Sequence, residues 1–231
     1  MQTFKNIKII AFDADDTLWH NEPMFRRAEK DFYALLTAYS PPEKTEKLLF
    51  KTEMKNLPLY GYGIKAFTLS MIETALKVSD NTAPANTIGK ILNISRAMLT
   101  APVSLLPGVE QTLKKLSAGY KIIVATKGDL LDQHRKLYKS GVAKYLHHIE
   151  VMREKDVKSY QKLLKDLDIK PQNFVMIGNS IKSDILPVLE IGGNAIYIPH
   201  PDTWAYEQSP PPKPGPRFTE VRTIKEVLRI I

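Results

Sequence analysis

The 231-residue sequence contains no cysteine, and this excludes disulfide frameworks, thiolate metal sites and a cysteine nucleophile. It also lacks an apolar run long enough to span a bilayer. The apolar stretch near the N-terminus is short and passes directly into aspartates, unlike the end of a signal peptide. We therefore expect a cytoplasmic protein with no membrane partner.

Basic residues exceed acidic ones, 33 against 25, and the formal net charge is +8. The lysines and arginines are spread along helical stretches and do not form a basic tract with interleaved aromatic residues. We expect a solvated surface with a mild preference for anionic ligands, and no nucleic-acid partner.

Short apolar runs alternate with longer amphipathic stretches, which is typical of a parallel sheet wrapped by helices. Four short runs are the clearest strand candidates, and near-continuous apolarity in the first three predicts strands that are buried on both faces. They cover residues 7–12, 121–126, 174–177 and 195–198. We predict an α/β fold with a Rossmann-like, doubly wound parallel sheet, whose ligands bind beyond the carboxyl ends of its strands.

The segment between the first two predicted strands has helical periodicity, and proline and glycine interrupt it so as to leave four or so helices. We expect a core domain of residues 1–18 and 103–231, with an inserted all-helical domain of residues 19–102. Within the insert, residues 59–65 contain two glycines, two tyrosines and Lys65. This stretch is either a substrate-selecting loop or a plain connection between helices.

A proline-rich stretch at residues 208–218 predicts a surface excursion near the C-terminus. Trp204 and Glu207 precede it, and we expect them to attach it to the core by packing and hydrogen bonding, with no catalytic role. The histidines are scattered, without acid partners or the spacing of a metal site.

Two aspartates, Asp13 and Asp15, stand where the first predicted strand ends. In the turn that leaves a buried strand, one carboxylate can attack while the other delivers or accepts a proton. Taken alone, Asp-x-Asp-x-Thr is also a common helix-capping arrangement. The two aspartates therefore indicate a catalytic site only in combination with the features that follow them in the chain.

Three further features come later in the chain, in order. Thr126, with Lys127 beside it, ends the second strand and offers a hydroxyl and backbone N–H groups to a phosphoryl oxygen. A lysine of REKDVKSYQKLL, either Lys155 or Lys158, can neutralise charge that develops during group transfer. The oxygen donors of GNSIKSD, residues 178–184, suit a hard cation.

This ordered set resembles the four motifs of the haloacid dehalogenase superfamily: Asp-x-Asp-x-Thr, Ser/Thr, Lys, and Gly-Asp-x-x-x-x-Asp. The similarity extends from residue 7 to about residue 200. It implies that Asp13 attacks phosphorus to form an aspartyl-phosphate. It also implies that Asp15 protonates the leaving group and then activates water, and that the helical insert is a cap over a small substrate.

The resemblance further implies a Mg²⁺ ion as cofactor. Asp13, the backbone carbonyl of Asp15, and Asn179 and Asp184 of the fourth motif would hold this ion. The expected contacts to the phosphoryl group and the rest of the substrate are Thr126, Lys127, Lys155 and, in the insert, Lys65.

The sequence departs from the family pattern in three places. Asp16 stands where glycine is usual in the family. Its carboxylate would lie near the cation, but we do not expect it to be a ligand. Asn179 replaces the first aspartate of the fourth motif, and the lost charge predicts weaker metal binding. The lysine motif lacks its usual Lys-Pro start; we favour Lys155 over Lys158, because Tyr160 then begins the next helix at about the family's spacing.

Asp15 favours phosphoryl transfer over dehalogenation, which has no leaving-group oxygen to protonate. We therefore predict a Mg²⁺-dependent phosphatase acting on a small phosphorylated metabolite. A phosphomutase, a phosphonate hydrolase, a dehalogenase and a catalytically idle binding protein of the same fold remain alternatives, and the oligomeric state is open.

Overall fold

The structure, a computed structural model, describes residues 3–231 and divides into two compact units. Each unit has its own hydrophobic core. We call them the sheet unit and the helical unit. The sheet unit consists of the chain up to Glu22, Val103–Lys127 and Gln133–Ile231, and the helical unit of Pro23–Pro102 with Gly128–Asp132.

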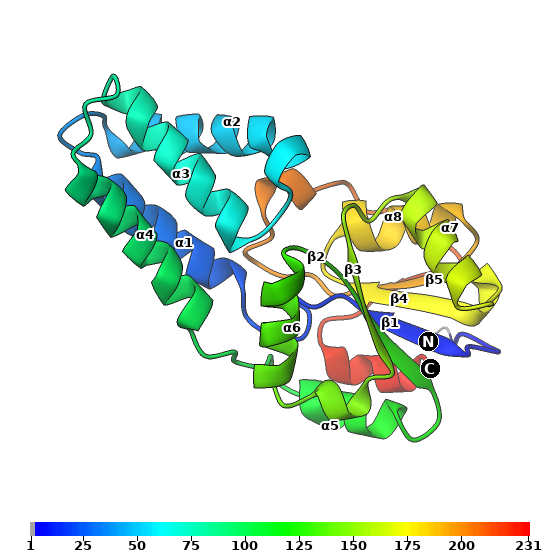
Figure 1. The fold of residues 1–231 in the computed structure, drawn as a ribbon. Helices are drawn as coiled ribbons and strands as arrows, with labels where there is room; N and C mark the ends of the chain where they lie inside the picture. Colours follow the sequence, from blue (N-terminus) through cyan, green and yellow to red (C-terminus); the bar gives the residue numbers. More distant parts are fainter. Residues whose placement is uncertain (1–2) are drawn as a thin grey trace. The chain divides into compact units, whose positions relative to one another are not determined.

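A six-stranded parallel sheet forms the centre of the sheet unit (Figure 1). Its strand order is β3-β2-β1-β4-β5-β6, so the chain builds outward from β1 on one side and from β4 on the other. This confirms the predicted doubly wound α/β fold, and the switch point lies between β1 and β4. The strands are β1 (Ile9–Phe12), β2 (Lys121–Lys127), β3 (His148–Met152), β4 (Phe174–Gly178), β5 (Asn194–Tyr197) and β6 (Phe218–Glu220).

The four predicted strands are present as β1, β2, β4 and β5, with small differences at their ends. The sequence prediction missed β3 and β6, which occupy the two edges of the sheet. In β3 only Met152 is fully buried, and no residue of β6 is. Edge strands face solvent along one side, so they lack the continuous apolar run by which the inner strands were found.

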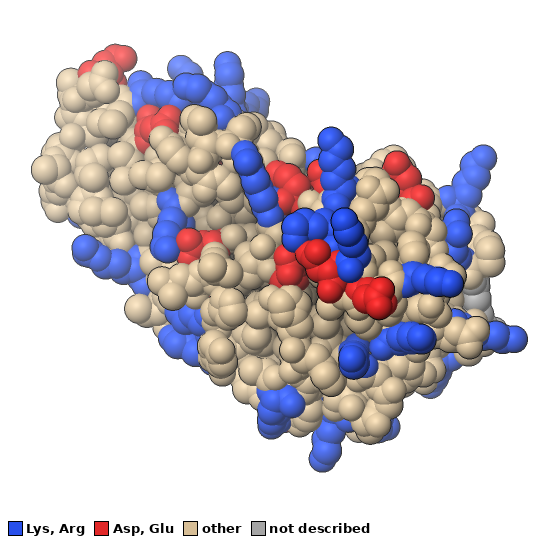
Figure 2. Space-filling model, turned by 45° about the vertical axis from the view of Figure 1, so that its right-hand side comes forward, with Lys and Arg blue, Asp and Glu red and all other residues tan. Residues whose placement is uncertain are grey.

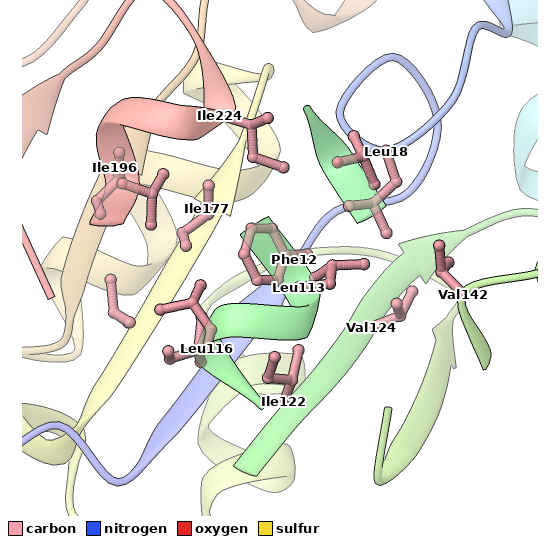
Figure 3. Packing of buried hydrophobic residues seen from close by; sticks show 14 of the residues in the cluster. Phe12, Leu18, Leu113, Leu116, Ile122, Val124, Val142, Ile177, Ile196 and Ile224 are labelled. Carbon is pink, nitrogen blue, oxygen red and sulfur yellow. The ribbon is translucent and has the colours of Figure 1, made fainter. Parts of the chain in front are cut away.

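Side chains of β1 alternate between the two faces of the sheet, and all of them are buried. Ile10 joins the core under α5 (Val109–Leu116) and η5 (Ile224–Arg229). Phe12 lies in the same core, close to Leu113 of α5 (Figure 3). Ile9 and Ala11 join the core under α7 and α8. The helices and short turns that follow the insert are α5 (Val109–Leu116), α6 (Leu130–Lys139), η1 (Ala143–Tyr145), α7 (Val157–Asp166), η2 (Pro171–Asn173), η3 (Ile181–Ile185), α8 (Leu186–Glu190), η4 (Ala205–Glu207) and η5 (Ile224–Arg229).

The insert folds into four helices, in agreement with the four or so predicted from the prolines and glycines that interrupt it. Phe32, Phe67 and Met71 are among the buried side chains of their shared core. The helices are α1 (Glu22–Leu35), α2 (Pro42–Tyr60), α3 (Ile64–Val78) and α4 (Ala85–Thr100).

Residues 59–65 connect α2 to α3. Helix α2 ends at Tyr60 and α3 begins at Ile64. Between them, Gly61 and Gly63 take φ angles of 71° and 102°, a region that side chains other than glycine rarely adopt. The two glycines are therefore required by the turn itself.

The distribution of basic side chains and the lengths of the helices are relevant to binding of nucleic acid and of membranes. On the face shown in Figure 2, lysine and arginine side chains are dispersed and not gathered in one tract. Helix α2, with 19 residues, is too polar to cross a membrane, and no other helix within residues 3–231 is long and apolar enough to do so.

Candidate active site

The carboxyl ends of β1, β2 and β4 bring the predicted site residues of the sheet unit to one edge. Phe12 ends β1 and is in register with Val124 of β2 and Ile177 of β4. Asp13 follows β1 directly, and its backbone N–H still donates to the carbonyl of Ile177, 2.8 Å away. The nucleophile candidate is therefore held by the sheet ladder itself.

A buried lysine joins the two carboxylates that the first and fourth motifs predict. The ammonium of Lys155 contacts Asp13 Oδ1 and lies 2.7 Å from Asp184 Oδ1. All three residues are at least nine-tenths buried. Lys158, the other candidate, is exposed on α7. The structure thus brings Lys155, and not Lys158, to Asp13.

Burial and like charge change the protonation of this cluster. Burial raises the pKa of Asp13 to about 7, and the carboxylate of Asp184 adds to the rise against the opposing effect of Lys155. Although burial alone would lower it, the pKa of Lys155 is raised by Asp13 and Asp184, which keeps its ammonium charged. Two carboxylates face one ammonium, so further positive charge is favourable here.

The turn after β4 holds Asp184 in place. The backbone N–H of Ser180 donates to Asp184 Oδ2 over 3.0 Å, and the N–H of Asp184 donates to the carbonyl of Ser180 over 2.9 Å. A Cβ on Gly178 would lie 2.2 Å from Asp184 Oδ2. Only glycine therefore lets this carboxylate pack against the end of β4.

The amide of Asn179 also reaches the first motif. The hydroxyl of Thr17 lies 3.1 Å from Asp13 Oδ2 and 3.2 Å from Asn179 Oδ1, so it can donate to either oxygen. Asp13, Asn179 and Asp184 present oxygen donors in one buried cluster, which is the ligand chemistry of Mg²⁺. The described residues contain no group of three or more acidic, histidine or cysteine side chains suited to a metal. The expected ion therefore depends on two carboxylates with amide and backbone oxygens.

The carboxylate of Asp15 turns to a different set of partners. Lys136 Nζ lies 2.6 Å and 2.7 Å from its two oxygens, and Gln133 and Trp19 donate to it over 2.9 Å and 2.7 Å. Burial alone would raise the pKa of Asp15, but the ammonium and the two neutral donors outweigh burial and lower it. Asp15 is therefore ionised here.

Asp16 stabilises the local backbone at the start of α1. Its φ of 61° explains why glycine is usual at this position, and aspartate tolerates the left-handed conformation better than most residues. Its carboxylate accepts from the N–H groups of Asn21 and Glu22 over 2.9 Å and 3.0 Å, at the start of α1. His200 Nε2 lies 3.6 Å from Asp16, so the expectation that no histidine has an acid partner was wrong.

The remaining predicted contacts lie in two places. The hydroxyl of buried Thr126 donates to the carbonyl of Lys127 over 3.2 Å, a local backbone contact. Lys127 Nζ lies 2.5 Å from Glu207 and 3.0 Å from Ser183. In the helical unit, Lys65 Nζ lies 3.0 Å from both carboxylate oxygens of Asp129.

The family model for haloacid dehalogenase-like hydrolases matches residues 7–192, which include Asp13, Lys155 and Asp184. The chain belongs to the haloacid dehalogenase-like hydrolases. It is similar to the glyceraldehyde 3-phosphate phosphatase of Methanothermobacter thermautotrophicus, with 26% identity over 83% of this chain and 85% of that protein. The phosphatase of the same name from Pyrococcus furiosus is 23% identical, over 84% of this chain and 81% of its own length.

A solved structure of a haloacid dehalogenase-like family hydrolase from Xanthomonas campestris is similar over nearly the whole chain. It is 37% identical, with a TM-score of 0.85, and the match covers 99% of this chain and 96% of that one. The similarity therefore includes the insert and the C-terminal segment as well as the sheet.

Sequence reasoning missed several residues at the site of this haloacid dehalogenase-like hydrolase. Gln133 and Lys136 lie three positions apart on α6, and both are buried. Their spacing places them on one face of the helix, but polar residues at such spacing usually face solvent. Glu207 was expected to attach the C-terminal segment to the core by packing and hydrogen bonding, and it does bond to Lys127, Ser180 and Ser183. No motif indicated that these partners lie at the site.

Proposed function

We propose that this hydrolase is a Mg²⁺-dependent phosphatase of small phosphomonoesters that acts through an aspartyl-phosphate on Asp13. The observation that carries the proposal is the buried contact of Asp13 and Asp184 with Lys155, with Asp15 two residues beyond the nucleophile. This arrangement supplies a nucleophile, a charge-neutralising group and a proton carrier.

In the first step, a carboxylate oxygen of Asp13 bonds to phosphorus while the ester P–O bond breaks, and the leaving oxygen takes a proton from Asp15. In the second step, a water oxygen bonds to phosphorus and gives a proton to Asp15. The bond between phosphorus and Asp13 then breaks, and phosphate leaves. The pairing of Asp15 with Lys136 suits the proton-accepting form, so this contact has to loosen for Asp15 to carry a proton in the first step.

Asp13, Asp184, Asn179 and the backbone carbonyl of Asp15 would hold the Mg²⁺ ion. When bound, Mg²⁺ favours ionised Asp13 and neutralises charge on the phosphoryl oxygens. The buried ammonium of Lys155 adds a fixed positive charge beside the nucleophile.

We also propose that the helical unit is a cap that selects the substrate, with Lys65 and the α2–α3 connection as contacts. Two tyrosines and Lys65 offer stacking and anion binding there. The side chain of Lys65 is 54% exposed beside Asp129, so an anionic substrate group can compete for its ammonium.

The relatives suggest which substrates to try first. Because the curated relatives are glyceraldehyde 3-phosphate phosphatases, a three-carbon phosphate ester is the first candidate within a panel of phosphorylated metabolites. Release of inorganic phosphate distinguishes a phosphatase from a phosphomutase, which returns an isomerised phosphate ester.

Hydrolysis of p-nitrophenyl phosphate tests the reaction itself. We expect Mg²⁺-dependent activity that is lost in Asp13→Asn. Asp168→Asn is a matched control, because Asp168 is exposed and its φ of 51° is one that asparagine tolerates. Metal-dependent hydrolysis that persists in Asp13→Asn would rule out the proposed mechanism.

A further inference from the structure

A glutamate in the segment between β5 and β6 contacts the turn that carries Asp184. Glu207 ends the short helix η4, and its side chain is 12% exposed. Its Oε1 lies 2.5 Å from Lys127 Nζ, while its Oε2 accepts from the hydroxyls of Ser180 and Ser183 over 2.7 Å and 2.5 Å. One carboxylate thus engages three groups that belong to the second and fourth motifs.

Lys127 completes this network from the end of β2. Its ammonium lies 3.0 Å from the hydroxyl of Ser183, and its side chain is 12% exposed, as is that of Glu207. Burial alone would raise the pKa of Glu207, but Lys127, Ser180 and Ser183 together lower it. Glu207 is therefore ionised, and both side chains are largely shielded from water, where such contacts are strong.

The network continues through Ser180 to Asp184 and from there to Asp13. The hydroxyl of Ser180 accepts from the N–H of Ser183 over 3.0 Å, and the N–H of Ser180 donates to Asp184 over 3.0 Å. Asp184 in turn contacts Lys155, which contacts Asp13. Glu207 is thus connected to Asp184 by hydrogen bonds through a single turn.

We infer that Glu207 and Lys127 are positioning residues that together clamp the turn of residues 180–184 and so hold the carboxylate of Asp184 at the site. The kinetic part of this inference rests on the proposed phosphatase function. It makes the C-terminal segment part of the active site, and it gives Lys127 a task other than the substrate contact expected from the sequence.

Two measurements test the clamp on Glu207→Gln, Lys127→Met and the double variant. Amide hydrogen exchange of residues 178–186 reports the turn without any need for activity. Mg²⁺-dependent hydrolysis of p-nitrophenyl phosphate gives kcat, KM and the Mg²⁺ concentration for half-maximal rate. Gln208→Ala is the control, because exposed Gln208 lies beside Glu207 and its side-chain amide donates to the carbonyl of Thr203 within its own segment.

We expect exchange in the turn to quicken about tenfold in each single variant, as the loss of one charge-assisted hydrogen bond would produce. The half-saturating Mg²⁺ concentration should rise and kcat should fall, while KM for the substrate stays the same. The double variant should be no worse than either single variant, Lys127→Arg should retain most of the activity, and Gln208→Ala should match the parent protein.

Unchanged exchange in both single variants would overturn the clamp, whether or not the protein is a phosphatase. A raised KM with unchanged Mg²⁺ dependence would also overturn it, because Lys127 would then contact substrate. If exchange is faster in the variants but the parent protein shows no metal-dependent hydrolysis, the clamp is supported and the proposed function is refuted. If Glu207→Gln does not fold, Lys127→Met tests the same contact from its other side.

Discussion

Replacing Lys136 with methionine tests the contact that holds Asp15. The ammonium of Lys136 lies within 2.7 Å of both Asp15 oxygens, and the two side chains are 7% and 24% exposed. Breaking a fully buried pair costs about 3–5 kcal/mol, whereas breaking an exposed pair costs about 1 kcal/mol or less. Asp15 keeps two neutral donors and some solvent, so we expect Lys136→Met to lose about 2 kcal/mol at pH 7.

Urea unfolding measures this loss. With a slope of about 2.5 kcal/mol/M, a loss of about 2 kcal/mol lowers the unfolding midpoint by about 0.8 M. Lys139→Met is the matched control, because Lys139 is exposed in the last turn of the same helix, and its replacement should change stability by less than about 0.5 kcal/mol.

A double-mutant cycle decides whether the loss comes from Asp15. In the Asp15→Asn background, Lys136 has lost the charge of its partner, so removing it should cost much less than in the parent protein. An equal cost of Lys136→Met in both backgrounds, or no cost in the parent protein, would refute the reasoning.

Three further predictions follow from single contacts. Asp156→Ala removes the cap bond to the N–H of Ser159 (2.8 Å) and should cost about 1 kcal/mol at pH 7. That bond lowers the pKa of Asp156, so its stabilisation is present above the unfolded pKa of about 3.9. The difference in melting temperature should therefore shrink as pH falls through the lower folded value, and a constant difference would contradict this. Gly178→Ala places a Cβ 2.2 Å from Asp184 Oδ2. It should lower the free energy of unfolding in urea by about 1–3 kcal/mol and weaken activation by Mg²⁺, and unchanged activation would count against the metal site. Lys65→Met should raise KM about tenfold at nearly constant kcat in steady-state assays, whereas a loss in kcat alone would exclude a role in substrate binding.

The inner part of the fold could be predicted because its strands are buried on both faces. Strands β1, β2, β4 and β5 are short apolar runs, and burial on two sides leaves no place for polar alternation. Strands β3 and β6 lie at the edges, where solvent relaxes that requirement. Burial on both faces therefore makes the inner strands predictable from the sequence, whereas the exposed edge strands are not.

The site divides in a similar way. Asp13 directly follows β1 and Asp184 lies in η3 after β4, so their meeting at one edge could be expected from the topology of the sheet. Lys155 follows the missed strand β3, so only the resemblance to the family's motifs pointed to it. Lys136 and Glu207 reach the site from a helix face and from an irregular segment. Their side chains look like ordinary surface residues in sequence, and only the tertiary contacts with Asp15, Lys127 and two serines distinguish them.

The central claim is that Asp13 carries the phosphoryl group during turnover, and chemical trapping tests it most directly. Borohydride added during hydrolysis reduces an aspartyl-phosphate to homoserine, which peptide mass spectrometry locates. We predict homoserine at position 13 alone, and only when substrate and Mg²⁺ are both present. Steady release of phosphate with Asp13 left unmodified would contradict the account.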